Sequence, residues 1–207
     1  MSAVVGVCDL LLVRHGESTW NAVRRWQGQA DPPLTERGED QARAAVELLS
    51  RLGPFEAVVT STLARAARTG DLLAQGIGVA DVRRHVGLVE RHAGPWQGLT
   101  RFEIDDRWPG YLDDDRRPDG YELDPSVVER SVAALVDIAG SFGGRSVLVV
   151  SHGGVINALE RHQREPWKRL DNLEGRWFQS DGTDLVPVGD RVRLTTWDAP
   201  SVDRGYA

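Results

Sequence analysis

Two histidines in this chain stand where side chains commonly do chemistry. His15 follows the apolar run 8–13, His152 follows the apolar run 146–150, and each is followed by glycine. Glycines where a strand passes into a helix let backbone N–H groups approach an oxyanion at the positive helix end. A neutral imidazole can attack phosphorus. We therefore expect a phosphate-binding site at these two junctions.

Two arginines and one carboxylate can complete such a site. Arg14 directly precedes His15, Arg65 falls in the first turn expected after the strand 55–60, and Glu90 lies in a glycine-punctuated loop. Guanidinium groups bind phosphoryl oxygens through paired N–H donors, and a protonated carboxyl can give its proton to a leaving oxygen. Taken alone, Arg14 and His15 are better explained as a strand cap, and Arg65 as a surface arginine.

The elements that must position these residues follow from hydrophobic periodicity. Apolar runs predict strands at 8–13, 55–60, 79–82 and 146–150, with terminal hairpins or edge strands within 172–197. Helical spacing predicts helices from the N-cap Thr35 to 52, over 63–73 with Ser61-Thr62 as cap, from Pro125 to the glycines at 140–144, and over 155–164. The near-continuous apolar run 8–13 is typical of a strand covered on both faces.

These elements predict an α/β fold. We expect a single three-layer αβα domain over residues 1–207, with a mostly parallel central sheet and an antiparallel edge strand. Ligands of such sheets bind outside the carboxyl ends of the strands, which is where the two histidines emerge. Residues 99–124 mix aromatic, acidic and basic side chains, and we expect them to form a cap-like insertion.

The composition and net charge of the chain limit the classes of partner that it can bind. A chain of 207 residues with 41% hydrophobic residues suits one domain, and the net charge of −6 argues against nucleic-acid or anionic-membrane binding. An anionic substrate would then need local arginines. The segment 1–7 has no basic region typical of a secretory signal, and no run approaches the roughly 18 apolar residues of a membrane span, so we expect a cytoplasmic protein.

The residues that most often bind metals or form disulfides are not arranged for either. The single cysteine, Cys8, lies in an expected core strand and is best explained as a small buried side chain. Asp113, Asp114 and Asp115 predict a solvated turn, because no histidine or cysteine stands near them at ligand spacing. We expect no metal cofactor.

Six ordered motifs link these residues to a known family. They are Leu12-Val13-Arg14-His15-Gly16-Glu17-Ser18 with Trp20-Asn21; Gln27-Gly28; Pro33-Leu34-Thr35-Glu36-Arg37-Gly38; Ser61-Thr62-Leu63-Ala64-Arg65-Ala66 with Thr69; Glu90 ahead of Gly94-Pro95-Trp96-Gln97-Gly98; and Val150-Ser151-His152-Gly153-Gly154. With them the chain resembles, from residue 11 to about 159, the histidine phosphatase superfamily, which includes the cofactor-dependent phosphoglycerate mutases.

The resemblance implies a role for each residue of the site. His15 would be the nucleophile that forms a phosphohistidine; Arg14, Arg65 and His152 would hold the phosphoryl group; and Glu90 would donate the proton and later activate water. Further substrate- or phosphate-binding residues are expected at Ser18, Asn21, Gln27, Gly28, Arg91, Arg101, Arg116, Arg117 and Gly153.

Three functions remain open from the sequence. Arg91, Arg101 and the pair Arg116-Arg117 resemble the mutase branch, whereas Ala93, Gln27, Gly154 and the short segment from Glu90 to His152 resemble the phosphatase branch. We favour a metal-independent phosphatase of small phosphorylated metabolites, because a shortened cap excludes water poorly. A mutase would need 2,3-bisphosphoglycerate as its only cofactor. A non-catalytic phospho-ligand module is the third, and the sequence leaves monomer and homodimer open.

Overall fold

A computed structural model describes residues 6–195, and the structural statements below concern this range. The first residues of the expected signal-free segment and the last residues of the expected terminal hairpin, 1–5 and 196–197, lie outside it. Within the described range, no helix has the length and apolar character that crossing a membrane requires.

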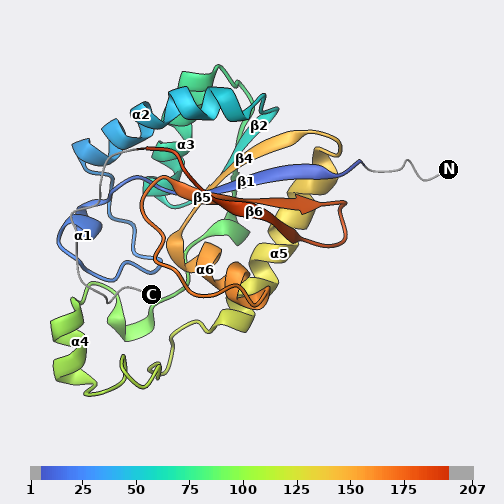
Figure 1. The fold of residues 1–207 in the computed structure, drawn as a ribbon. Helices are drawn as coiled ribbons and strands as arrows, with labels where there is room; N and C mark the ends of the chain where they lie inside the picture. The colour runs from blue at the N-terminus through green and yellow to red at the C-terminus, as the bar shows by residue number, and fades with distance from the viewer. Residues whose placement is uncertain (1–5, 196–207) are drawn as a thin grey trace.

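A six-stranded mixed sheet forms the centre of the molecule (Figure 1). Its strands are β1 (Cys8–Arg14), β2 (Ala57–Ser61), β3 (Val82–His85), β4 (Ser146–Ser151), β5 (Glu174–Ser180) and β6 (Val186–Arg193), in the spatial order β3-β2-β4-β1-β5-β6. The first four in that order are parallel, and β5 and β6 add antiparallel pairs at the β1 side. The expected sheet is therefore confirmed.

Strand β1 explains why both faces of the sheet are covered. Leu10 and Leu12 point into one apolar cluster, while Leu11 and Val13 point into another, and all four are fully buried. Alternate residues of a strand face opposite sides, so an unbroken apolar run requires helices on both. Burying each leucine stabilises the fold by about 1.5–3 kcal/mol.

Two pairs of helices supply that cover. The helices α2 (Glu36–Leu52) and α3 (Ala64–Ile77) pack on one face, and α5 (Asp124–Ser141) and α6 (Gly153–His162) pack on the other (Figure 1). Thr35 is the N-cap of α2, as expected: its hydroxyl accepts a hydrogen bond from the Gly38 amide at 3.0 Å. The three-layer arrangement is confirmed.

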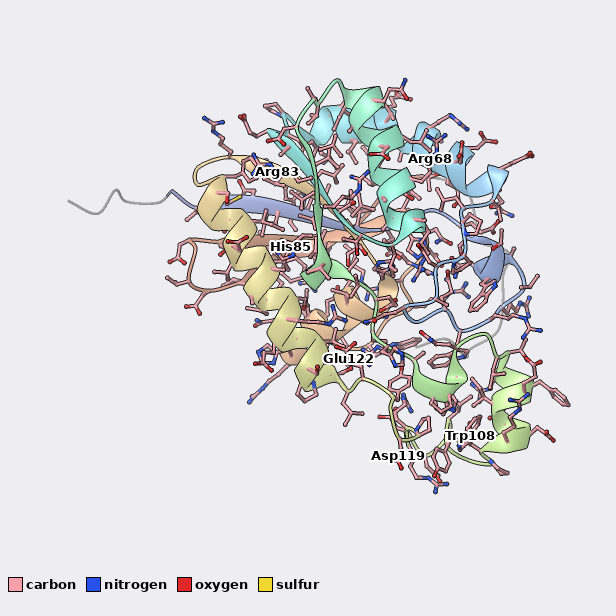
Figure 2. The ribbon with its side chains drawn as sticks, turned by 180° about the vertical axis from the view of Figure 1, so that it is seen from behind. Arg68, Arg83, His85, Trp108, Asp119 and Glu122 are labelled. Atoms are coloured by element: carbon pink, nitrogen blue, oxygen red, sulfur yellow. The ribbon has the colours of Figure 1, made fainter. Side chains whose placement is uncertain are left out.

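The strand expected at 79–82 is wrong in position. Strand β3 begins only at Val82, and Arg83 and His85 lie along this edge strand (Figure 2). Val79 instead closes the end of α3: its N–H donates to the Ala74 carbonyl at 3.0 Å, after Gly78 has taken the left-handed conformation. This is a Schellman motif, in which an apolar residue after the glycine packs back on the helix.

The start of α3 also differs from the prediction. Leu63 occupies the N-cap position, and no side chain caps the helix. Ser61, expected as a cap, ends β2, and its hydroxyl accepts a hydrogen bond from the Leu63 amide at 3.2 Å. This shift brings Ser61 to the edge of the sheet.

The segment expected as a cap is built around aromatic rings. It contains the short helix α4 (Arg101–Arg107) and follows the 3-10 turns η1 (Val86–Leu88) and η2 (Gly94–Trp96). Trp96 is fully buried and makes edge-on contacts with Trp26, Trp108 and Tyr121. In Figures 1 and 2 this segment lies beside the sheet, next to the start of α5. The aromatic cluster therefore gives the segment a small core of its own.

Candidate active site

The register of two parallel strands brings the two histidines together. Arg14 of β1 pairs with Ser151 of β4, so the residues that follow leave the sheet at the same edge. The His15 amide donates to the Ser151 carbonyl at 3.1 Å, and the rings of His15 and His152 lie 5.2 Å apart in an edge-on arrangement. The expected meeting of the strand ends is present in the structure.

The proton of His15 has a defined position. Its Nδ1 lies 2.6 Å from the Gly16 carbonyl oxygen, which can only accept, so Nδ1 carries the hydrogen. Its Nε2 then keeps a lone pair and accepts from Nε of Arg65 at 3.2 Å. Burial, and after it the charges of Arg65 and Arg14, hold the pKa of His15 well below 6.5. His15 is therefore neutral at physiological pH.

Arg65 is held in place by hydrogen bonds to two backbone carbonyls. Its side chain is fully buried, and its two terminal nitrogens donate to the carbonyls of Ala30 at 2.7 Å and Gly28 at 2.9 Å. Gly28 has φ +54°, and a Cβ there would lie 2.8 Å from the Ala93 amide nitrogen, so glycine is required. Burial lowers the pKa of Arg65 to about 10, which still leaves the guanidinium charged.

His152 has one buried nitrogen without a partner. Its Nε2 lies 2.8 Å from the hydroxyl of Ser61, while Nδ1 has no hydrogen bond within the described part of the chain. Burial lowers the pKa of His152 well below 6.5, with further contributions from the charges of Arg65, His15 and Arg14. A buried polar atom left unsatisfied beside a reactive group is a feature that a bound anion would relieve.

Glu90 is held by two backbone amides. Oε1 accepts from the Arg91 N–H at 2.7 Å, and Oε2 accepts from the Gly154 N–H at 3.0 Å. A Cβ at Gly154 would lie 2.3 Å from Oε1 of Glu90, so any side chain at this position displaces the carboxylate. The absence of a side chain at residue 154 therefore leaves the space that the Glu90 carboxylate occupies.

Arg91 supports this arrangement from behind. Its guanidinium donates to Asp124 at 2.7 Å and to the Gly154 carbonyl at 3.2 Å, and Asp124 also accepts two hydrogen bonds from Arg161. Arg91 lines the cavity described next, but its charge is already paired. Its contacts therefore place it as a support for Glu90 and Gly154.

A cavity of about 250 Å³ opens at this edge of the sheet. Of the residues expected in the site, those that line it are Arg14, His15, Asn21, Gln27, Gly28, Glu90, Arg91 and Gly153. Arg65 and His152 lie behind His15 and contact it directly. Ser18 is buried: its hydroxyl donates to Gln27 at 2.6 Å, and it caps the short helix α1 (Thr19–Ala22) with Asn21.

Three arginines expected in the site are not among the residues that line the cavity. Arg101 pairs with Asp113 at 2.9 Å, Arg116 with Asp114 at 2.9 Å, and Arg117 with Asp115 at 2.6 Å. The structure does not bring these three side chains to the cavity, and their role in binding substrate stays a prediction. The acidic run is exposed, as expected, but it also neutralises the nearby basic residues.

The sequence did not indicate the residues that immediately precede β5, the strand next to β1. The Asn172 side chain donates to the His15 carbonyl at 2.8 Å, and Arg14 donates to the Leu170 carbonyl at 2.6 Å. Because β5 runs antiparallel to β1, the residues before β5 must lie at the end of β1. That pairing would have been the signal to look for.

Comparison with known proteins agrees with this geometry. A family model described as the histidine phosphatase superfamily (branch 1) matches residues 10–191. The chain belongs to this superfamily. The resemblance carried by the six motifs is thereby confirmed.

Relatives with assigned names fall into both branches considered above. A glucosyl-3-phosphoglycerate phosphatase of Mycolicibacterium vanbaalenii is 38% identical, over 92% of this chain and 94% of the relative. A metal-independent phosphoserine phosphatase of Arabidopsis thaliana is 38% identical, over 74% and 67%. A probable phosphoglycerate mutase, GpmB, of Cronobacter sakazakii is 35% identical, over 94% and 97%.

A solved structure shows the same fold. The mycobacterial glucosyl-3-phosphoglycerate phosphatase in complex with VO3 superposes with a TM-score of 0.74 at 32% identity, covering 87% of this chain and 96% of that one. The α/β architecture of that structure therefore extends over most of this chain.

The low pKa values of the two histidines predict a pH dependence of folding. In the unfolded chain each histidine has a pKa near 6.5. Below that pH the unfolded chain therefore binds protons that the folded state does not bind. Stability is therefore lost as pH falls below about 6.5, with a slope of up to about 1.4 kcal/mol per pH unit for each histidine. Urea unfolding between about pH 5 and pH 7 measures this slope, and His15→Gln should reduce it. A double variant, His15→Gln with His152→Gln, should lose most of this slope. If its stability still falls with pH as steeply as that of the wild type, the low pKa values assigned to the two histidines are contradicted.

Proposed function

We propose that this protein is a phosphatase that hydrolyses phosphomonoesters of small metabolites through a phosphohistidine on His15. The observation that carries the proposal is the protonation of His15, whose Nδ1 hydrogen points to the Gly16 carbonyl so that Nε2 carries the lone pair needed for attack. The phosphatase names among relatives support the same reaction class.

In the first step, Nε2 of His15 attacks phosphorus, a nitrogen–phosphorus bond forms and the ester phosphorus–oxygen bond breaks. Arg14, Arg65 and His152 hold the phosphoryl oxygens, with Nδ1 of His152 gaining the partner it lacks. Glu90 gives its proton to the leaving alkoxide, so the alcohol departs neutral.

In the second step, a water molecule attacks the phosphohistidine. The Glu90 carboxylate, oriented by the amides of Arg91 and Gly154, takes the proton from that water as the nitrogen–phosphorus bond breaks. Inorganic phosphate leaves and His15 returns to its neutral form. The positive charge that stabilises both transition states comes from arginines, so we propose a reaction that needs no metal cofactor.

Hydrolysis is favoured over mutase transfer by the surroundings of the cavity. Arg101, Arg116 and Arg117, which the mutase reading needs near the substrate, pair with aspartates instead. Mutase transfer is the second candidate, supported by the GpmB relative. It predicts interconversion of 2- and 3-phosphoglycerate that depends on added 2,3-bisphosphoglycerate, and the absence of interconversion in its presence would exclude mutase transfer.

Substitution of the nucleophile tests the proposal directly. His15→Ala should lower phosphatase turnover by about 10³-fold or more, because the covalent route is lost. Rapid quench with labelled substrate should trap acid-labile phosphate on the wild-type protein and none on the variant. The exposed His162→Ala serves as the control. Label that persists on the His15 variant would overturn the assignment.

Glu90→Gln separates proton donation from phosphate binding. Turnover of alkyl phosphates should fall by about 10²–10⁴-fold, the usual contribution of general acid–base catalysis. The first step with p-nitrophenyl phosphate should suffer less, because nitrophenolate leaves without a proton. Burst kinetics measure both steps, and an equal loss of the first step for both esters would remove Glu90 from the acid role.

Gly154→Ala tests the position of that carboxylate without removing it. The new methyl group displaces Oε1 of Glu90, and a misplacement of about 1 Å can cost about 10²-fold in turnover. Gly140→Ala is the matched control, because a Cβ there meets nothing within 4 Å. Thermal unfolding checks that both variants fold. Full activity of the Gly154 variant would show that this glycine does not position Glu90.

A further inference from the structure

One polar side chain that lines the cavity takes no part in the reaction proposed above. Asn157 lies in α6, three residues after Gly154, and is 8% exposed. Residues three apart lie on the same side of a helix. Because the Gly154 amide donates to Glu90 at 3.0 Å, Asn157 lies about one helical turn beyond the residue that we propose as proton donor.

A buried arginine determines which way the Asn157 amide is turned. A terminal nitrogen of Arg191 lies 3.0 Å from Oδ1 of Asn157. A guanidinium carries only N–H donors, so the atom that faces it must be the amide oxygen and not the amide nitrogen. The –NH2 group of Asn157 therefore points away from Arg191.

Arg191 is itself held by several partners. Its Nε donates to Glu160 at 2.9 Å, its other terminal nitrogen donates to the Arg169 carbonyl at 2.8 Å, and its side chain is 7% exposed. Glu160 is also buried and lies 3.5 Å from Arg176. Breaking a buried ion pair leaves an uncompensated charge, so this arrangement resists rearrangement. The orientation of the Asn157 amide is therefore a fixed property of the fold.

The –NH2 group of Asn157 is available to a ligand. No residue in the range 6–195 accepts a hydrogen bond from it, and it is not among the fully buried polar atoms that lack a partner. It is therefore reached through the cavity that Asn157 lines. A donor that loses water without gaining an acceptor costs free energy, so a ligand with an acceptor at this place is favoured.

The alcohol part of a substrate must lie on this side of the cavity. In-line displacement puts the leaving oxygen opposite Nε2 of His15 across the phosphorus, and Glu90 protonates that oxygen from hydrogen-bond distance. The carbon atoms attached to the leaving oxygen then lie beside Glu90. Asn157 is the next polar residue along α6, and it lines the same cavity of about 250 Å³.

The charges near Asn157 favour a neutral oxygen over an anionic one. The amide itself is uncharged, and Glu90, about one helical turn away, repels an anion whenever it is ionised. An amide –NH2 group donates equally to a hydroxyl or an ether oxygen. Either group on the alcohol would give these N–H donors the acceptor that the protein does not supply.

We infer that Asn157 is a specificity-determining residue, whose –NH2 group donates to a neutral hydroxyl or ether oxygen on the alcohol part of the phosphomonoester. Arg191 is a positioning residue, since it acts by turning that group toward the cavity. This inference rests on the proposed phosphatase reaction. It adds a requirement on the part of the substrate that does not react.

Two esters of equal charge and similar size test the donor. 2-Methoxyethyl phosphate differs from butyl phosphate only by an ether oxygen in place of a methylene group, and that oxygen can only accept. Wild-type kcat/KM should be about three- to tenfold higher for the ether, the usual net effect of one hydrogen bond. The pair 2-hydroxyethyl phosphate and propyl phosphate tests a hydroxyl in the same way.

Substitution then locates the preference. Asn157→Ala should bring the ratio of kcat/KM within each pair of esters to about one. Asn157→Asp keeps an oxygen for Arg191 but has no N–H, so it should also lose the preference for the ether. Because each ratio compares two esters on one protein, a smaller folded fraction does not change it.

Gln163→Ala is the matched control. Gln163 is an exposed amide just after the end of α6, donates to the Leu185 carbonyl at 3.2 Å and is not among the residues that line the cavity. Its substitution should leave both ratios as in the wild type. Thermal unfolding checks that all three variants fold.

Four results would overturn the inference. They are equal rates within both pairs in the wild type, a preference that persists in Asn157→Ala, a preference for the ether that persists in Asn157→Asp, and hydrolysis of p-nitrophenyl phosphate but of none of the four alkyl esters. Failure to hydrolyse any ester, with no phosphoenzyme, would instead overturn the phosphatase itself.

Discussion

The pairing of β1 with β4 is the constraint on which the rest of the structure depends. Its parallel register places Arg14 opposite Ser151, so two segments that are far apart in the sequence leave the sheet side by side. A slip by one residue would turn Leu10 and Leu12 toward the wrong cluster and would separate His15 from His152. The same apolar alternation that stabilises the core therefore also sets the geometry of the site.

The positive charge around His15 has two effects, one on the protonation of the imidazole and one on the binding of the phosphoryl group. A less buried site could not combine them. Arg65 and Arg14 disfavour a proton on the imidazole, which keeps Nε2 available, and the same charges attract the phosphoryl group that Nε2 attacks. Burial strengthens both effects, since fields are screened less away from water. Burial also lowers the pKa of Arg65 itself, but the hydrogen bonds from its guanidinium to two loop carbonyls favour the charged form.

The sequence was most informative where local patterns decide structure. Unbroken apolar runs located β1 and β4, and the residues that follow them, His15 and His152, meet as expected. Short-range patterns were less reliable where two motifs compete for the same apolar residue. Val79 is a residue type that is common in strands, but here its amide closes the end of a helix.

Contacts between residues far apart in the sequence were the main feature that the sequence did not predict. Asn172 contacts His15 only because β5 pairs antiparallel with β1, and no spacing near either residue announces that pairing. The arginines of the segment 99–124 lie away from the cavity for the opposite reason. For Arg116 and Arg117 the paired carboxylates lie only two residues away, so these side chains pair locally.

The hydrogen bond from Asn172 to His15 also bears on when the protein acquires its site during synthesis. Residue 15 leaves the ribosome before the residue that holds its carbonyl, which follows more than 150 positions later. Contacts of such long sequence separation form late, because the intervening chain must first be ordered. A nascent chain can thus carry the reactive imidazole long before it is locked in place. Activity should emerge only once nearly the whole domain has been made.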